Sequence, residues 1–298
     1  MNRITLPWQE LAEDTYRSVF SQSKIAFDLS GVWLMVAVLL SFLGLGIFPM
    51  LTADDLGGLE IYLLVPAVLG LFALVGLAIF ATRWARWVML NHLPPPGRAM
   101  TLGRSELLVG WAALENLILG IAPVVAAFWY ASRLIDQGQF EAGFALQGGG
   151  ILVGAFLLAR VGMAVNLAAL QVPRDSLAFA WHLSSGQSVR LLLLLIITVG
   201  PAVLAAWGID WALDWALQPM PDMIAPEMQK ALAVAMMAAL GFLGLMLFLA
   251  AMGLAARNLI LAKGEDPWAG AGDEEAEEWE DEAPQPQQAD AVWNEVLE

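Results

Sequence analysis

Apolar and polar residues follow one another along the chain in long blocks. Six blocks of about 17–26 mostly apolar residues are each bounded by polar, proline or charged positions. An α-helix rises about 1.5 Å per residue and needs about 20 residues to cross a hydrocarbon core of about 30 Å. The pattern therefore predicts six membrane-spanning helices, at 31–50, 58–81, 106–130, 148–170, 191–207 and 231–256.

The positions of lysine and arginine predict the orientation of these spans. If the N-terminus lies in the cytoplasm, 11 of the 14 basic residues fall in cytoplasmic segments, only Arg133 and Lys230 fall outside, and Arg160 lies within a span. Cytoplasmic loops of membrane proteins carry an excess of lysine and arginine. The sequence therefore predicts an all-α bundle of six transmembrane helices with both termini in the cytoplasm.

Two amphipathic stretches flank the predicted spans. Between the fifth and sixth spans, Trp207, Trp211 and Trp215 recur every four residues opposite two aspartates, which predicts an interfacial helix on the outer side. Residues 1–29 also place apolar side chains at helical spacing opposite acidic ones, which predicts a helix lying along the inner membrane surface. The apolar positions of this first stretch include Trp8, Leu11, Ala12, Tyr16, Val19 and Phe20.

Composition agrees with membrane insertion and separates the body of the chain from its C-terminal end. The chain is 59% hydrophobic and 14% charged, whereas soluble domains are about 45–50% apolar and about 25% charged. Residues 265–298 hold 13 acidic and no basic side chains, which leaves 16 acidic and 14 basic ones elsewhere. The body is therefore nearly neutral, and it lacks the basic surface with which proteins bind nucleic acid.

Residues 264–298 are predicted to form a disordered acidic tail. Glycine, proline, glutamine and acidic residues dominate this segment, and such a composition buries too little apolar surface to offset the entropy lost on ordering. The tail fits two interpretations, a solvated extension or a segment whose apolar end forms a short helix on a partner protein. The candidate partner-binding residues are Trp279, Trp293, Val296 and Leu297.

Ionisable residues within the spans are candidates for function, because a charge at the bilayer centre costs at least about 2.5–3.5 kcal/mol. Glu115 and Arg160 lie nine and ten residues from the cytoplasmic ends of the third and fourth spans, so both are expected about 14–15 Å deep. We predict that they form an ion pair, with Asn116 and Asn166 available as hydrogen-bonding neighbours. Such a pair would either belong to a polar pathway or proton relay, or fix helix register as a self-neutralised contact.

Small residues and prolines indicate where helices approach one another or bend. Gly150 and Gly154 form a GxxxG pair, which is typical of close packing within a bundle or, alternatively, of homo-oligomerisation. Prolines within spans predict kinks, which either adjust packing or open a cavity. These prolines are Pro66, Pro123 and Pro201.

Catalytic and metal-binding motifs are missing from the sequence. The chain has no cysteine, and its only two histidines, His92 and His182, fall in different predicted loops. It also has no HExxH motif, no phosphate-binding glycine loop with its lysine, and no serine nucleophile elbow. The sequence therefore predicts a protein that binds no metal, needs no cofactor and is not an enzyme.

Two short stretches carry a resemblance to a known group of proteins. Residues 180–187, AWHLSSGQ, run through Val189 and Arg190 into the fifth span, and residues 16–20, YRSVF, precede the first. With the six-span layout, they resemble uncharacterised bacterial inner-membrane proteins related to the glycerophosphoryl diester phosphodiesterase membrane domain. In that family the phosphodiesterase chemistry belongs to a separate soluble domain. The resemblance therefore implies a bacterial inner-membrane module with no catalytic residues to carry over.

These observations divide the chain into a cytoplasmic amphipathic lead-in (1–29), a transmembrane domain (30–263) and the acidic tail (264–298). We interpret the protein as an accessory or scaffold that lies in the lipid bilayer and engages a partner protein through its tail. The alternative is a transporter or permease component in which Glu115 and Arg160 line the path of the cargo.

Overall fold

The computed structural model of the 298-residue chain describes residues 6–21, 59–90, 103–171, 175–217 and 226–263, with a few isolated positions between 24 and 39. Every secondary-structure element in these ranges is a helix. The elements are α1 (Trp8–Tyr16), the π-helical turn η1 (Arg17–Ser21), α4 (Leu59–Leu90), α5 (Arg104–Asp136), α6 (Phe140–Val161), α7 (Met163–Ala169), α8 (Ser176–Leu183), α9 (Ser188–Thr198), α10 (Gly200–Leu217) and α11 (Pro226–Ala262).

Four helical stretches in the described part of the chain are long and apolar enough to cross a membrane. They correspond to the third, fourth, fifth and sixth predicted spans, and α4 covers the second. Most of the first predicted span, 31–50, lies outside the described residues, as does the acidic tail. The fold is thus compatible with an integral, multi-pass membrane protein, while the total of six spans stays a prediction. The four stretches are Arg104–Asp136, Phe140–Ala169, Ser188–Ile209 and Ala235–Ala262.

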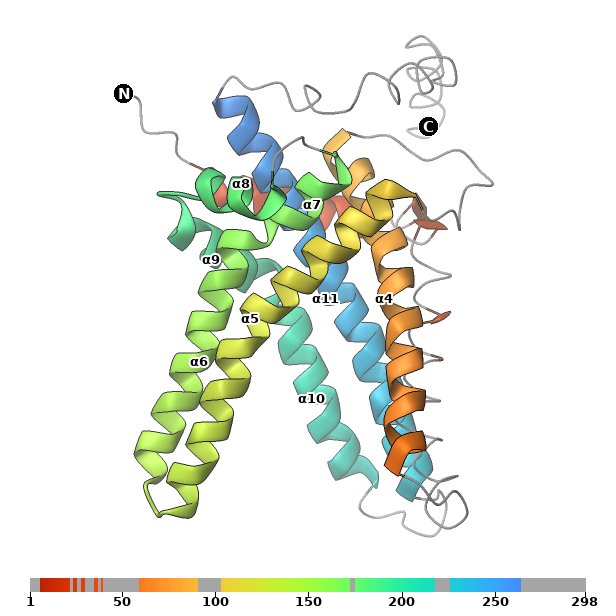
Figure 1. Ribbon diagram of the computed structural model, residues 1–298, viewed down its shortest axis with the longest axis vertical. Coiled ribbons are helices and arrows are strands. Elements are labelled where there is room, and N and C mark those ends of the chain that lie inside the picture. The colour runs from red at the N-terminus through yellow and green to blue at the C-terminus, as the bar shows by residue number, and fades with distance from the viewer. Residues whose placement is uncertain are drawn as a thin grey trace.

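The helices are arranged as an upright bundle closed at one end by helices that lie across it (Figure 1). α5 and α6 form a long antiparallel hairpin, α10 packs along α11, and α4 lies beside α11. α7 and α8 lie across the bundle at the end opposite the α5–α6 turn, and α1 packs there against α9 and α11. We refer to α1, α7 and α8 together as the transverse layer.

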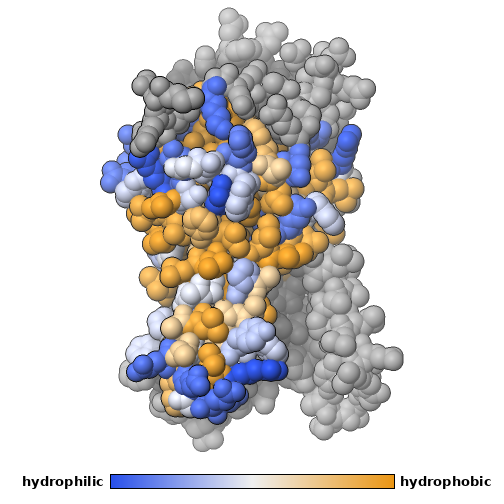
Figure 2. All heavy atoms as spheres, turned by 60° about the vertical axis from the view of Figure 1, so that its left-hand side comes forward, coloured by the Kyte–Doolittle hydropathy of each residue, from blue (hydrophilic) through white to orange (hydrophobic). Residues whose placement is uncertain are grey.

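The surface of the molecule carries an apolar band between two polar ends. Figure 2 shows polar residues at the transverse layer and again at the α5–α6 turn, with apolar side chains between them. Soluble monomers rarely expose contiguous apolar patches of more than a few hundred Å². A lipid environment would accommodate this band, whose members on the hairpin include Leu117, Ile121, Val125, Phe128, Ile151, Leu152 and Phe156.

The packed core lies at the end of the bundle that carries the transverse layer. All seven residues of α7 are buried, and its six apolar residues are shared between two apolar clusters. The first cluster joins α7 to α1, α8, α9 and α11, and the second joins it to α4, α5, α10 and α11. The helices therefore converge on α7, whereas the far half of the α5–α6 hairpin depends mainly on its own internal contact.

Small residues form that internal contact, as the GxxxG pair predicts for packing within a bundle. A Cβ atom built on Gly154 would lie 2.5 Å from the carbonyl oxygen of Gly120 in α5, and one on Gly150 would collide with the Cβ of Ala127. The backbones of α5 and α6 therefore approach too closely for any side chain at these two positions.

Two of the predicted spans are bent where the sequence offers a helix-breaking residue. The fourth changes direction at Gly162, between α6 and α7, where a Cβ would lie 2.7 Å from the ring of Phe248 in α11. The fifth changes direction between α9 and α10, just before Pro201. The proline cannot donate a backbone hydrogen bond, so the helix is interrupted in front of it. Pro123, by contrast, lies inside the uninterrupted helix α5.

The predicted outer interfacial helix is not a separate element. α10 continues without a break from Gly200 to Leu217, so the tryptophans at 207, 211 and 215 lie on the same helix as the second half of the fifth predicted span. The side chains of Trp207 and Trp211 are 75% and 70% exposed. A tryptophan every fourth residue is equally typical of the aromatic belt at the end of a spanning helix, and for this reason the spacing did not discriminate between the two arrangements.

Candidate functional site

Arg160 lies beneath the transverse layer and fastens α6 to α8. Its Nη2 donates a hydrogen bond of 2.9 Å to the carbonyl of Trp181, and its Nε donates one of 3.4 Å to the hydroxyl of Ser184. The guanidinium also stacks over the indole of Trp181, with Cζ 3.7 Å from the ring centroid. Three contacts from one guanidinium thus fix the position of α8 on the bundle.

Glu115 has a different partner, on its own helix. The indole Nε1 of Trp111 donates a hydrogen bond of 2.6 Å to Oε1 of Glu115, one turn away along α5. Within the described residues, no ion pair joins Glu115 to Arg160. The predicted ion pair is therefore not formed in this structure, and each charged group is tied locally instead.

The two residues nevertheless lie at a similar level along the hairpin. α5 and α6 cross where Gly154 meets the carbonyl of Gly120. From this crossing towards the transverse layer, Glu115 lies five residues from Gly120, which is about 7.5 Å along α5. In the same direction, Arg160 lies six residues from Gly154, which is about 9 Å along α6. The expected match in level is thus present, but the two side chains point to different partners.

Arg160 lies nearer the end of its helix than the hydrophobic block indicated. The predicted span runs from 148 to 170, whereas α6 starts at Phe140 and ends at Val161. Residues 163–169 form the separate helix α7. Arg160 is therefore the next-to-last residue of α6, beside the transverse layer that it contacts.

Asn116 and Asn166 are buried without any hydrogen-bonding partner in the described structure. Their exposed fractions are 4% and 0%, and all four side-chain polar atoms are unpaired. The amide of Asn166 lies against Gly253 of α11, where a Cβ would approach its Oδ1 to 3.1 Å. The expected hydrogen bonds to Glu115 and Arg160 are thus not made. Burying an amide without a partner costs roughly 2–7 kcal/mol, so these two side chains are the least satisfied polar groups of the described bundle.

Arginines in the segments predicted to be cytoplasmic are in part built into the core. Arg83 and Glu106 are each only 9% exposed, and the Glu106 carboxylate lies within electrostatic range of the Arg83 guanidinium. Glu106 also accepts hydrogen bonds from the backbone N–H of Gly103 at 2.8 Å and the hydroxyl of Ser105 at 3.0 Å. Nε of Arg86 donates to the carbonyl of Ala169 at the end of α7. The positions of charged residues in the sequence do not reveal that these side chains are buried.

A tyrosine of the transverse layer compensates for the proline kink. Because Pro201 has no N–H, the carbonyl of Ile197 loses its usual donor four residues ahead. The hydroxyl of Tyr16 in α1 donates a hydrogen bond of 2.6 Å to this carbonyl and lies 3.4 Å from that of Thr198. The sequence contains both signals, an aromatic residue with a polar end on an amphipathic helix and a proline in a span. Only the fold brings them together.

We expect Tyr16→Phe to lower the free energy of unfolding by about 1 kcal/mol, the typical net contribution of one such hydrogen bond. The measurement is denaturant unfolding of the purified protein in mild detergent. Tyr130→Phe is the matched control, because Tyr130 is 57% exposed and its only described contact is with the ring of Trp129. Equal stability of the two variants would show that the hydroxyl of Tyr16 contributes nothing at the kink.

The same hydrogen bond should depend on pH. Burial raises the pKa of Tyr16 above its ordinary value of 10.0, so the folded protein favours the neutral phenol that can donate to Ile197. A group with a raised folded-state pKa stabilises the fold fully below the unfolded pKa and loses this contribution as pH rises through the folded one. The stability difference between the wild type and Tyr16→Phe should thus be constant below pH 10 and be lost as pH rises from there through the raised folded-state pKa.

Residue types that bind metals do not gather into a candidate site in the described part of the chain. No group of three or more histidine, cysteine, aspartate or glutamate side chains converges there. The predicted partner-binding residues of the tail lie outside the described residues; they are Trp279, Trp293, Val296 and Leu297.

Comparison of the chain with protein-family models, with curated proteins and with solved structures found no match. The resemblance to the glycerophosphoryl diester phosphodiesterase membrane domain therefore stays a prediction from the sequence, and the functional argument rests on the geometry described above.

Proposed function

We propose that the protein is a non-enzymatic accessory or scaffold protein of the bacterial inner membrane, with the transverse layer at the cytoplasmic surface. The observation that carries this proposal is the environment of Arg160. As the arginine within a span, it was the natural candidate for a transport path, yet its guanidinium is fixed on Trp181 and Ser184 of the transverse layer. A charge held by three structural contacts serves to build a platform on the bundle.

The position of α11 supports a role for the tail beside that platform. With 37 residues, α11 is about 55 Å long and exceeds the hydrocarbon core of about 30 Å. Its C-terminal end projects past the transverse layer (Figure 1). The tail therefore starts on the side where α1 and α8 lie. In this proposal the acidic segment and the transverse layer together offer one continuous surface to a cytoplasmic partner protein.

The alternative function, a transporter or permease component, is favoured by one observation. Asn116 and Asn166 place four unpaired polar atoms in the interior of the bundle. Unpaired amides at this depth would bind water or a polar cargo. The alternative therefore assigns the transport path to these two asparagines, with Glu115 and Arg160 near its end.

The scaffold proposal is tested by recovering partners from native membranes in mild detergent. We expect a defined partner to copurify with the full chain and with Trp268→Ala, but to be lost when the chain ends at Lys263 or carries Trp279→Ala with Trp293→Ala. The Trp268→Ala variant is the matched control, because it removes one tail indole outside the proposed docking residues. If recovery is the same with and without the tail, the scaffold proposal is wrong.

The same variants distinguish the alternative. A transporter component should support flux of its cargo, and this flux should be lost in Asn116→Leu and Asn166→Leu but unaffected by removal of the tail. The scaffold function should therefore be lost in the tail variants, and the transport function in the asparagine variants.

A further inference from the structure

A small pocket opens where the start of α1 meets the start of α9. It has a volume of about 280 Å³ and is lined by Leu6, Pro7, Trp8, Gln9, Glu10 and Arg190. Pockets for drug-sized ligands measure about 300–1,000 Å³. A pocket at the lower limit of this range suits a small polar group of a few heavy atoms.

The pocket is held together by a side chain in the turn before α9. The Oε1 atom of Gln187 accepts a hydrogen bond from the backbone N–H of Leu6 and another from Nη1 of Arg190, each at 3.4 Å. Gln187 therefore anchors the segment that leads into α1 and orients the guanidinium of Arg190 at the same time. Leu6 is only 3% exposed, so its side chain forms a fixed apolar base for this junction.

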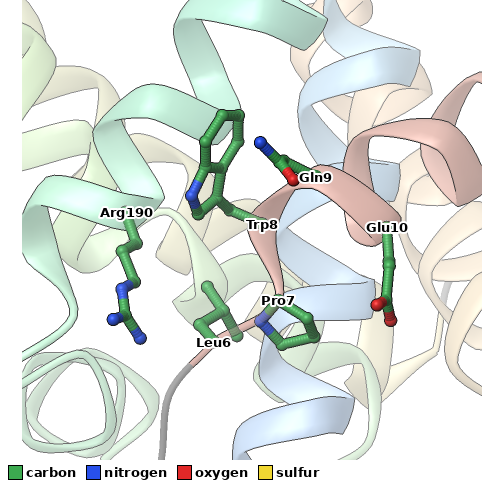
Figure 3. A pocket seen from close by; sticks show the side chains of 6 residues that line it. All are labelled: Leu6, Pro7, Trp8, Gln9, Glu10 and Arg190. Atoms are coloured by element: carbon green, nitrogen blue, oxygen red, sulfur yellow. The ribbon is translucent and has the colours of Figure 1, made fainter.

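Opposite charges stand on the two sides of the pocket. Figure 3 shows Arg190 on one side of Leu6 and Pro7 and Glu10 on the other, with the indole of Trp8 and the amide of Gln9 above them. No ion pair joins Arg190 to Glu10 in the described structure. The two charges are thus separated and do not neutralise each other directly. A purely anionic ligand would meet repulsion from Glu10, so the arrangement favours a ligand that carries both a negative and a positive group.

The surroundings of the pocket point to a lipid as the source of this ligand. α1 is an amphipathic helix that buries Leu11 and Ala12 against the bundle and exposes Glu13, which pairs with Arg17 at the start of η1. Such helices lie at the boundary between headgroups and acyl chains. Tryptophan side chains favour the same level, and Trp8 occupies it here. The exposed Pro7 beside the two charges would contact the glycerol and first acyl carbons.

We propose that this pocket binds the headgroup of a phosphatidylethanolamine molecule of the adjacent leaflet. The guanidinium of Arg190 and the positive N-terminal end of α1 receive the phosphate, and the carboxylate of Glu10 receives the ammonium group. A bound lipid would hold α1 against α9. The proposal requires only that the transverse layer lies at the membrane surface, and it is independent of the scaffold function.

The test is lipid retention by the full-length protein in detergent, measured by native mass spectrometry with equal amounts of phosphatidylethanolamine and phosphatidylglycerol. We expect the wild type to retain one phosphatidylethanolamine in preference. Arg190→Gln should weaken this binding about tenfold, because a charge-assisted hydrogen bond of about 1.5 kcal/mol is lost. Glu10→Gln should remove the preference for phosphatidylethanolamine while leaving phosphatidylglycerol binding unchanged, since the latter lipid has no ammonium group.

Two variants on the exposed face of α1 and η1 serve as matched controls. Arg17→Gln and Glu13→Gln remove the same charges outside the pocket, where the two side chains pair with each other at 3.0 Å. The proposal is overturned if Arg190→Gln and Arg17→Gln retain lipid equally, or if the preference survives Glu10→Gln. Soluble phosphoethanolamine that displaces the lipid at equal concentration would also overturn it, because the ligand would then be a free metabolite. Glu10 is exposed, so its variant keeps the test valid even if Arg190→Gln fails to fold.

Discussion

Gly154→Ala is expected to lower the free energy of unfolding by about 1–3 kcal/mol, the usual cost of overpacking a close contact. The added methyl group would lie 2.5 Å from the carbonyl oxygen of Gly120 and 2.8 Å from Cγ2 of Val124. The first of these atoms belongs to the backbone, so a change of rotamer cannot relieve the collision, and α5 and α6 must separate. The measurement is denaturant unfolding of the purified protein in mild detergent.

Gly149→Ala provides the matched control on the same helix. A Cβ at Gly149 would meet no heavy atom within 4 Å, so the substitution adds a methyl group without a collision. Alanine is favoured over glycine within a helix by up to about 1 kcal/mol, and this variant should be as stable as the wild type or slightly more stable. If both variants lose the same stability, the close contact between α5 and α6 does not explain the loss in Gly154→Ala.

Asn166→Leu should have the opposite effect to Gly154→Ala and raise the free energy of unfolding by about 1–3 kcal/mol. This gain is the desolvation penalty of a buried polar group that lacks a partner. Leucine has nearly the same shape as asparagine, and its branch would replace the unpaired Oδ1 and Nδ2. The gain should be measured by the same unfolding experiment, and a parallel gain is expected for Asn116→Leu.

Asn258→Leu is the control for this prediction, because the amide of Asn258 does have a partner. Its Nδ2 donates a hydrogen bond of 3.1 Å to the carbonyl of Leu254, so its replacement should bring no gain. If Asn166→Leu instead destabilises the protein, the amide of Asn166 has an occupant in the membrane, such as an ordered water molecule. A stabilised variant that has lost flux would assign Asn166 to a transport function, since unsatisfied groups at functional sites are retained at a cost in stability.

The hydrophobic pattern predicted the helices well because their length and composition are set by the bilayer. The third to sixth blocks each fall on a long apolar helix, and the kink before Pro201 follows from the missing N–H. The bend at Gly162 escaped prediction, because its cause is the ring of Phe248 from another helix. Glycine is common in membrane spans, so the residue alone carries no such signal.

The candidate site was predicted less completely, since it depends on where helices end and how they are rotated. The expected depth of Arg160 was counted from residue 170, but α6 ends at Val161, so Arg160 lies next to the transverse layer. Helix rotation then decides whether residues at one level meet, and Glu115 turns towards Trp111. The burial of Arg83 likewise follows from the packing of α4 against α5, which no local pattern encodes.

The contact between Tyr16 and Ile197 also has a consequence for biosynthesis. The two residues are 181 positions apart in the chain, and translation proceeds at about 5–20 residues per second. α1 is thus synthesised on the order of 10–40 s before the carbonyl that it will bind exists. During this interval the helix can shelter its apolar face only on the membrane surface or on a chaperone. Because α1 also packs against α11, its docking has to wait until both α9 and α11 have been made.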